Sequence, residues 1–189
     1  MGRRAARGLR PAPLLVVITG SESTGKTTLA ARLAERYATA WAAEFSREYA
    51  AAKGTPLGAS DVEPIARGQI ALEDRARHAA ADAGAPLVFL DTDLASTVVY
   101  AHHYYGACPA WIERAAGERL GDLYLLCHPD VPWVADPQRD RPAHRDELHA
   151  RFQARLAALG ALGARVADVR GGWEERERRA IHAVDALLR

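Results

Sequence analysis

LLVVITGSESTGKT, residues 14–27, is the stretch that indicates the fold. Its first part, Leu14–Ile18, is a continuous apolar run rich in β-branched residues, which is typical of a strand buried on both faces of a sheet. A polar turn that contains Gly20 and Gly25 follows. A helical stretch over residues 26–37 comes next, with leucines four residues apart. The order strand, glycine turn, helix predicts the first unit of a parallel α/β sheet.

Residues 20–27, GSESTGKT, fit the pattern G-x-x-x-x-G-K-S/T without a mismatch, between a strand and a helix as that pattern requires. Its glycines allow successive backbone N–H groups to converge on phosphate oxygens, and the helix N-terminus adds further donors. We expect Lys26 to reach the β/γ-phosphates of ATP and the Thr27 hydroxyl to hold Mg²⁺. The alternative is a glycine turn without a ligand. The predicted ATP-binding residues of this loop are Gly20, Ser21, Glu22, Ser23, Thr24, Gly25, Lys26, Thr27 and Thr28.

Further strand candidates follow along the chain, at 87–90, 123–127, 165–169 and, more weakly, 40–45. Helical segments separate them, at about 61–83, 94–104, 109–119, 144–159 and 173–188. This alternation predicts a parallel sheet with helices on both faces, in one α/β domain over residues 14–189. Residues 1–13 are rich in arginine and carry almost nothing apolar to bury, so we expect a flexible Arg-rich tail. A nucleic-acid-binding arm is the alternative for that tail.

The composition argues against several classes of protein. The 189 residues include 25 basic and 24 acidic side chains, so no overall charge favours nucleic acid or a membrane surface. Cys108 and Cys127 lack a CxxC spacing, which argues against a disulfide-framed secreted fold and a structural zinc site. No apolar run approaches the roughly 20 residues of a membrane-spanning helix, and Leu14–Ile18 is too short for a signal peptide. We expect a cytoplasmic protein without a membrane partner.

LVFLDTD, residues 87–93, is the second segment that predicts chemistry. A carboxylate at the end of a buried strand lies at the carboxyl edge of the sheet, beside the P-loop if the two strands are neighbours. We therefore expect Asp91 to bind Mg²⁺ together with Thr27. Asp93 points the same way as Asp91 if the strand continues, and it is then a candidate for substrate binding and catalysis. A merely polar strand end is the alternative.

Other motifs narrow the class of nucleotide-binding protein. The chain has no N/T-K-x-D loop for reading guanine and no LSGGQ-like segment, and its length argues against an AAA+ module with a helical lid domain. Small kinases remain, with one sheet, one P-loop, an acceptor pocket and a mobile lid. The lid candidate is residues 129–145, which include Trp133, Asp136, Arg139 and Arg145. Because a lid arginine neutralises the migrating phosphoryl group and a lid excludes water, Arg139 is a predicted catalytic residue. A charged surface loop is the alternative.

Two further segments supply candidate residues. EFSREY, residues 44–49, follows the weak strand on the side that faces the acceptor. Glu44 suits a general base, and Arg47 and Tyr49 are candidates for orienting the substrate. The start of an amphipathic helix is the alternative. Trp173, after the last strand, is a candidate wall of the adenine pocket, with a core tryptophan next to a helix cap as the alternative.

Six segments occur in order along the chain: GSESTGKTTLA (20–30), EFSREY (44–49), IARGQIALED (65–74), LDTD (90–93), DLYLLCHPDVPWVAD (122–136) and GGW (171–173). Together they resemble the ribosylnicotinamide kinase domain of the bacterial bifunctional NAD-biosynthesis regulators. The resemblance implies a thymidylate-kinase-like core, a three-layer P-loop sandwich with five parallel strands. It also implies ATP- and Mg²⁺-dependent phosphorylation of the ribose 5′-hydroxyl of nicotinamide riboside, which gives nicotinamide mononucleotide.

The acceptor pocket is where this chain departs from the family. Members carry a tryptophan where Ala43 stands and an aromatic residue where Leu72 stands, so ring stacking would fall to other aromatic side chains. The residues we expect to bind the substrate are Glu44, Phe45, Arg47, Tyr49, Asp93, Tyr100, Trp133 and Asp136. A kinase of the same fold for another nucleoside or nucleotide stays open, as does an ATP-dependent sensor module. The sequence leaves the oligomeric state open.

Overall fold

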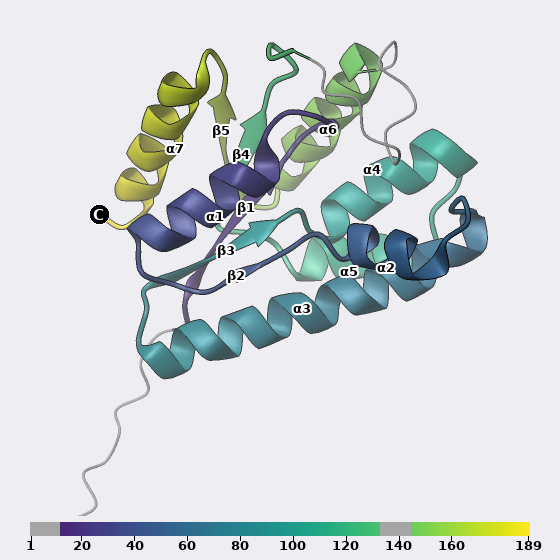
Figure 1. The fold of residues 1–189 in the computed structure, drawn as a ribbon, viewed down its shortest axis with the longest axis horizontal. Helices are drawn as coiled ribbons and strands as arrows, with labels where there is room; N and C mark the ends of the chain where they lie inside the picture. Colours follow the sequence, from purple (N-terminus) through teal and green to yellow (C-terminus); the bar gives the residue numbers. More distant parts are fainter. Residues whose placement is uncertain (1–11, 133–144) are drawn as a thin grey trace, which may run out of the picture.

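The computed structural model describes residues 12–132 and 145–189, which form a five-stranded parallel sheet in the order β2-β3-β1-β4-β5 (Figure 1). The strands are β1 (Leu14–Thr19), β2 (Trp41–Ala42), β3 (Leu87–Asp91), β4 (Leu123–Cys127) and β5 (Arg165–Val169). The α-helices are α1 (Lys26–Arg36), α2 (Phe45–Lys53), α3 (Val62–Ala83), α4 (Leu94–Tyr105), α5 (Ala110–Glu118), α6 (Arg145–Gly160) and α7 (Trp173–Leu187), with a 3₁₀ turn η1 (Ala59–Asp61). The predicted α/β fold with five parallel strands is confirmed.

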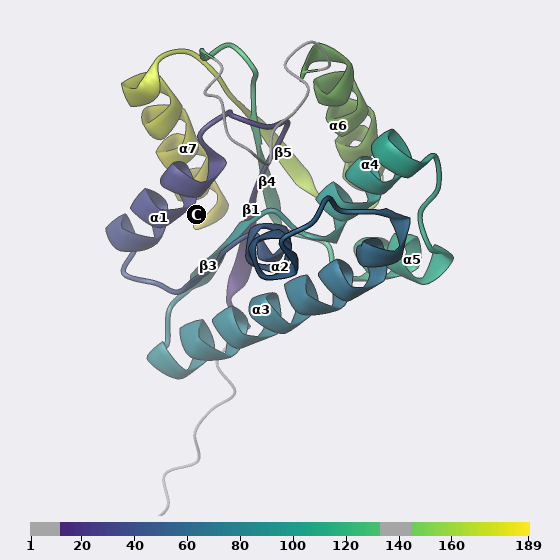
Figure 2. The same ribbon diagram turned by 45° about the vertical axis from the view of Figure 1, so that its right-hand side comes forward.

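Helices cover both faces of the sheet (Figure 2). Alternate side chains of β1 belong to two different core clusters, one on each face. Val16 and Ile18 pack against Leu29 of α1 and against apolar residues of α7. Leu15 and Val17 pack in a second cluster with residues of α3, α4 and α6. All four β1 side chains are almost fully buried, which is why this strand is an uninterrupted apolar run.

The carboxyl ends of the strands meet at one edge of the sheet, the upper edge in Figure 1. Ile18 of β1 pairs with Asp91 of β3, and Thr19 pairs with Leu126 of β4. The segments that follow these three strands therefore begin next to one another. Since β3 lies on one side of β1 and β4 on the other, the strand order changes direction here, which is where open α/β sheets bind ligands.

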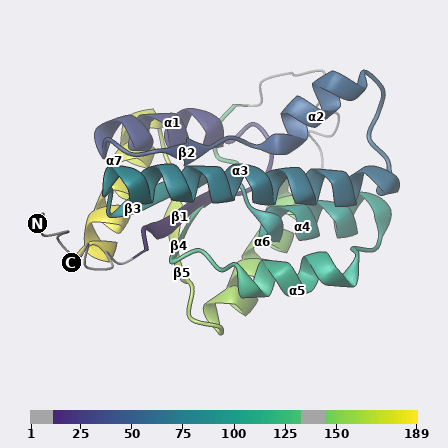
Figure 3. The same ribbon diagram turned by 90° about the horizontal axis from the view of Figure 1, so that it is seen from below.

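The segment after β2 differs from the strand that we predicted over residues 40–45. The strand ends at Ala42, and α2 begins at Phe45 with Glu44 as its N-cap, so this segment starts a helix. Figure 3 shows α2 beside α3, beyond the ends of the strands. None of the α2 residues is fully buried, so this helix adds no residue to the core.

Cys108 and Cys127 are both free thiols, and Cys127 is fully buried in β4. Among residues 12–132 and 145–189, no helix is long and apolar enough to cross a membrane.

Candidate functional site

The loop after β1 has a backbone that favours glycine at its two key positions. Gly20 has φ +127°, and a Cβ there would lie 2.5 Å from the carbonyl oxygen of Cys127. Gly25 has φ +81° and precedes the first residue of α1. Ser23 also has a positive φ, of 54°. These conformations turn the chain sharply from β1 into α1, as a phosphate-binding loop requires.

Lys26 lies inside this loop, with only 6% of its surface exposed. Its Nζ donates to the backbone oxygen of Ser21 at 2.9 Å, and the Thr24 hydroxyl donates to the same oxygen at 2.9 Å. The loop thus holds a buried ammonium group at the N-terminus of α1. Both features attract an anion to the same place.

Asp91 is fully buried at the end of β3, and neither of its carboxylate oxygens has a hydrogen-bond partner among the described residues. Burial raises the pKa of Asp91 and nearby Glu44 raises it further, while Lys26 and Thr27 act in the opposite direction. A buried carboxylate without a hydrogen-bond donor is a costly arrangement that a divalent cation relieves. The Asp91 carboxylate and the Thr27 hydroxyl are oxygen ligands of the kind that Mg²⁺ prefers, so the two residues fit the ion.

Asp93 differs from the expectation that it points the same way as Asp91. The strand ends at Asp91, and Thr92 has φ +67°, which breaks the alternation of side chains. Asp93 becomes the N-cap of α4, where its Oδ1 accepts the backbone N–H groups of Ala95 at 3.0 Å and Ser96 at 3.3 Å. Its Oδ2 accepts the hydroxyl of Tyr124 at 2.8 Å. The carboxylate is therefore occupied in holding α4 to the sheet.

A cavity of about 760 Å³ opens beside the P-loop, between α2, α3 and α4. Lys26 and Glu44 both line it. The Glu44 carboxylate is held by two neighbours, because it accepts the Ser46 hydroxyl at 3.0 Å and the Arg47 Nε at 3.0 Å. Glu44 thus presents an oriented carboxylate to the same space that the P-loop lysine reaches.

Gln69 fixes this arrangement from α3 and was not among the predicted site residues. It is 3% exposed, lines the cavity, and its Oε1 accepts the backbone N–H of Phe45 at 2.9 Å. Its Nε2 donates to the backbone oxygen of Thr92 at 3.4 Å. Gln69 therefore joins the start of α2 to the end of β3. A buried amide on the inner face of a long helix was the available signal.

Tyrosines supply the aromatic surface of the cavity. Tyr100 and Tyr104, one turn apart on α4, have nearly parallel rings with centroids 6.2 Å apart and planes at 9°. The Tyr104 hydroxyl donates to Oε1 of Glu22 in the P-loop at 3.2 Å. The expected Tyr100 is thus at the cavity, together with Tyr104 and Tyr105, which sequence reasoning missed.

Phe45 and Tyr49, both expected to bind the substrate, make their contacts elsewhere, and so does Leu72. Phe45 lies against Gly68 of α3, and Leu72 packs against the core on the α3 face of the sheet. The Tyr49 hydroxyl donates to Oδ1 of Asp61 at 2.9 Å, so it ties α2 to the 3₁₀ turn before α3. Because Leu72 faces the core, an aromatic ring at that position is not needed to complete this cavity.

Trp173 begins α7 and lies against the P-loop. A Cβ on Gly25 would be 3.2 Å from Cζ3 of the Trp173 ring, and the Arg32 guanidinium lies 5.2 Å from the centre of that ring. The ring also packs against the core cluster on the α1 face. Trp173 is therefore a neighbour of the P-loop and packs against the core, and its role at an adenine pocket stays a prediction.

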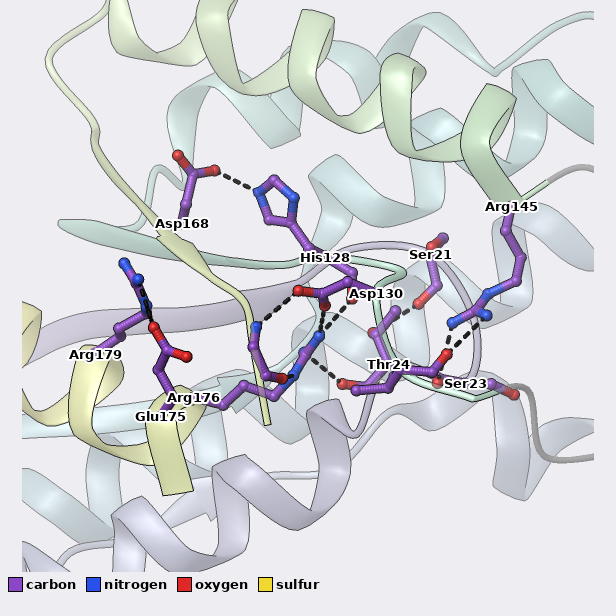
Figure 4. Close-up of polar contacts among 12 residues, drawn as sticks. Ser21, Ser23, Thr24, His128, Asp130, Arg145, Asp168, Glu175, Arg176 and Arg179 are labelled. Carbon is purple, nitrogen blue, oxygen red and sulfur yellow. Dashed lines mark hydrogen bonds and ion pairs between the residues drawn. The ribbon is translucent and has the colours of Figure 1, made fainter. Parts of the chain in front are cut away.

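The lid candidate is described only at its ends. Trp133, Asp136 and Arg139 lie outside the described residues. Arg145, at the start of α6, donates to the backbone oxygens of Val131 at 3.0 Å and Ser23 at 3.4 Å (Figure 4). A positive charge from that segment thus reaches the P-loop.

The family model that matches this chain is described as an AAA domain and covers residues 15–176. The description names an AAA domain, whereas we expected the chain to be too short for an AAA+ module. That expectation concerned a module with an additional helical lid domain, whereas the match covers the α/β domain itself.

Curated relatives carry the name trifunctional NAD biosynthesis/regulator protein NadR. The Escherichia coli (strain K12) protein is 33% identical over 128 residues, which are 66% of this chain and 30% of that protein. The Salmonella typhimurium (strain LT2) protein matches with the same identity and coverage. This chain therefore spans less than a third of the length of these relatives.

Solved structures of similar fold include NadR protein in complex with NR, with a TM-score of 0.77 and 29% identity. NadR protein in complex with NAD and AMP-PNP matches with a TM-score of 0.74 and 30% identity. Each match covers 93% of this chain and 49% of the other chain. Thymidylate kinase from Ehrlichia chaffeensis, with a TM-score of 0.60 and 14% identity, matches in fold alone.

Proposed function

The chain belongs to the P-loop family described as an AAA domain and is a P-loop kinase homologous to NadR, and from that premise we propose that it phosphorylates nicotinamide riboside with Mg·ATP. The product would be nicotinamide mononucleotide, by transfer to the ribose 5′-hydroxyl. The observation that carries the proposal is that Lys26 and Glu44 line one cavity. A donor-phosphate lysine and an acceptor-side carboxylate facing the same space are what an in-line transfer needs.

The base of the proposed acceptor is a positively charged pyridinium ring. Tyrosine faces attract such a ring, and nearby carboxylates add to the attraction. Tyr100 and Tyr104 offer parallel rings, and Glu22 accepts the Tyr104 hydroxyl at the same wall of the cavity. These residues would take over the stacking that the family assigns to the position of Ala43. The homologous NadR structure in complex with NR, which we take to be nicotinamide riboside, supports this acceptor.

Each catalytic residue has a role that follows from its place. Mg²⁺, held by Thr27 and Asp91, would offset negative charge on the donor phosphates. Lys26 and the loop N–H groups bind the donor phosphates. Glu44 takes the proton of the acceptor hydroxyl, aligned by its bonds from Ser46 and Arg47. We also propose that Arg139 of the lid candidate stabilises the charge on the transferring phosphoryl group, and that Trp133 and Asp136 bind the substrate. Asp93 has a structural role instead, as the N-cap of α4.

The proposal is tested by ADP release with Mg·ATP across a panel of acceptors that includes nicotinamide riboside, uridine, thymidine and deoxyadenosine. We expect the highest kcat/KM with nicotinamide riboside, because the other bases are uncharged. Lys26→Ala should abolish the release.

Turnover only with a neutral nucleoside would keep the kinase and overturn the acceptor. ATP binding without any acceptor-stimulated turnover would favour the sensor module instead.

A further inference from the structure

One arginine that the proposed chemistry does not use is buried beneath the P-loop. Arg176 of α7 is 1% exposed, and its side chain reaches the Thr24 backbone of the loop (Figure 4). A fully buried guanidinium is costly unless all of its donors are used. The arrangement of those donors indicates what the residue does.

The guanidinium of Arg176 joins three separate segments. Its Nη1 donates to the backbone oxygen of Thr24 in the P-loop at 3.2 Å. Its Nη2 donates to the backbone oxygen of His128 at 2.8 Å and also pairs with Asp130, both in the segment after β4. Its Nε donates to the backbone oxygen of Gly171 at 2.9 Å, in the turn between β5 and α7.

Asp130 closes this arrangement on its other side. While one carboxylate oxygen pairs with Arg176, Oδ2 accepts the backbone N–H of Gly171 at 2.7 Å. Gly171 has φ +92°, a conformation that suits glycine, so both polar groups of its backbone meet the Arg176–Asp130 pair. The three loops are therefore held by one ion pair.

The hydrogen bond from Arg176 to the Thr24 carbonyl fixes the orientation of the peptide between Thr24 and Gly25. In a trans peptide the N–H points opposite to the C=O. Holding the Thr24 carbonyl toward α7 therefore turns the Gly25 N–H away from α7. The carbonyl of the preceding peptide is held separately, because Arg145 of α6 donates to the Ser23 backbone oxygen at 3.4 Å.

We propose that Arg176 is a positioning residue that aims the Gly25 N–H at the donor phosphates by holding the Thr24 carbonyl. An anion site made of backbone N–H groups works only while the carbonyls of the same peptides are kept away from the anion. Lysine cannot replace arginine here, because one ammonium group cannot reach three loops as a planar fork does. The inference rests on the proposed phosphate-donor site and is independent of which acceptor the enzyme uses.

The test compares Arg176→Lys with Arg179→Lys. Arg179 lies one turn further along α7, where it pairs with Glu175 at 2.6 Å, so its replacement is a matched control. Calorimetry on the full chain would measure binding of Mg·AMP-PNP and of Mg-tripolyphosphate, at temperatures well below the melting point of each variant. We expect Arg176→Lys to raise both Kd values at least about tenfold, the effect of roughly one charge-assisted hydrogen bond, with Arg179→Lys unchanged.

Tripolyphosphate has no adenosine, so it separates the loop from the adenine side. A loss confined to AMP-PNP, or Kd values of Arg176→Lys within twofold of the control, would overturn the inference. A structural defect alone would also raise the KM of the acceptor, whereas positioning of the loop should raise only the KM for ATP. Since neither ligand involves the acceptor, failure here is distinguishable from failure of the proposed acceptor.

Asp130→Asn keeps the test decisive if Arg176→Lys folds poorly. The amide retains the shape of the side chain but loses the charge that fixes the guanidinium, and Asp130 is partly exposed. Binding of Mg-tripolyphosphate should weaken several-fold in this variant. An unchanged Kd would count against the role of the ion pair.

Discussion

At the scale of single residues, the site separates the group that holds the donor from the group that activates the acceptor. Lys26 is tied to the P-loop through the Ser21 carbonyl, and Glu44 is tied to Ser46 and Arg47. The two side chains reach one cavity from different elements and have separate partners. Replacing one of them should therefore impair one step and leave the binding of the other substrate intact.

Glu44→Gln should lower kcat by about 10²- to 10⁴-fold, the usual contribution of a general base. The KM for ATP should change little, because the P-loop bonds do not involve Glu44. Glu48→Gln, on the exposed side of the same helix, is the control. Steady-state kinetics with nicotinamide riboside measures both, and a kcat within threefold of wild type would exclude Glu44 as the base.

Asp91→Asn should raise the stability of the ligand-free protein and make its nucleotide binding less dependent on Mg²⁺. Burial raises the pKa of Asp91 above 3.8, so the folded state keeps its proton to a higher pH than the unfolded state does. The free energy of unfolding therefore falls as pH rises through that window, and the neutral amide avoids the loss. We expect the melting temperature near pH 7 to rise by a few degrees.

The control for Asp91→Asn is Asp82→Asn, at an exposed position of α3. Calorimetric scans with and without Mg·AMP-PNP compare the two variants. A lower melting temperature for ligand-free Asp91→Asn would contradict the view that this carboxylate is kept for the ion.

At the scale of elements, α3 holds the acceptor side of the site in place. Gly68 of α3 touches the Phe45 ring so closely that a Cβ there would overlap it, and Gln69 accepts the Phe45 backbone N–H. Phe45 is the first residue of α2, directly after Glu44. The position of the proposed base is thus set by a helix that itself contributes no acid or base.

Gly68→Ala should raise the KM of the acceptor several-fold through a shift of α2. In an exposed helix the same change would stabilise by about 0.5–1 kcal/mol, so the clash with Phe45 has to exceed that gain. Gly117→Ala in α5, where a Cβ meets nothing within 4 Å, is the matched control. Equal KM values for the two variants would show that α2 is not held through this contact.

Glu73, also on α3, predicts a pH dependence of stability. Burial is the main reason that its pKa rises from 4.5 to about 8, and Asp93 nearby raises it further, against Arg119. Between those values the folded state binds more protons than the unfolded state, so the free energy of unfolding falls as pH rises from about 4.5 to about 8. Glu73→Gln should remove most of this fall, on the order of a few kcal/mol by pH 9, in urea titrations. An unchanged slope would mean that Glu73 is ionised in the folded protein.

The elements that could be predicted from sequence are those whose burial leaves a clear pattern. The strands β1, β3 and β4 are apolar runs between glycine or polar turns, and the P-loop motif stands between β1 and α1 where its chemistry requires. Helix α2 contains no fully buried residue, so burial leaves a weaker pattern there than in the strands. The direction of Asp93 depends on the positive φ of Thr92, which a local sequence motif does not reveal.

The positions of Tyr104 at the cavity and of Arg176 at the P-loop depend on contacts between distant parts of the chain. Tyr104 meets Glu22, 82 residues away, and Arg176 meets Thr24, 152 residues away. Patterns in a single sequence indicate turns and the buried faces of helices and strands. These partners are instead brought together by the order of the strands in the sheet. The P-loop side of the site was therefore predictable in detail, and the acceptor side only in outline.

At the scale of the whole molecule, the strand order β2-β3-β1-β4-β5 gathers the site at one edge of the sheet. The P-loop leaves β1, Asp91 ends β3, and the Arg176–Asp130 pair joins the segments after β4 and β5. The helices α2, α3 and α4 add the cavity beside the P-loop. The fold thus positions a donor site and an acceptor site next to each other, and we propose that the acceptor is nicotinamide riboside.

The most direct test of that claim is identification of the product. ³¹P NMR on the full chain with Mg·ATP and nicotinamide riboside should show ADP and a 5′-phosphomonoester of the riboside forming in equal amounts. Glu44→Gln should form neither at a comparable rate. ADP with inorganic phosphate and no phosphorylated riboside, or a phosphate on another hydroxyl, would contradict the account.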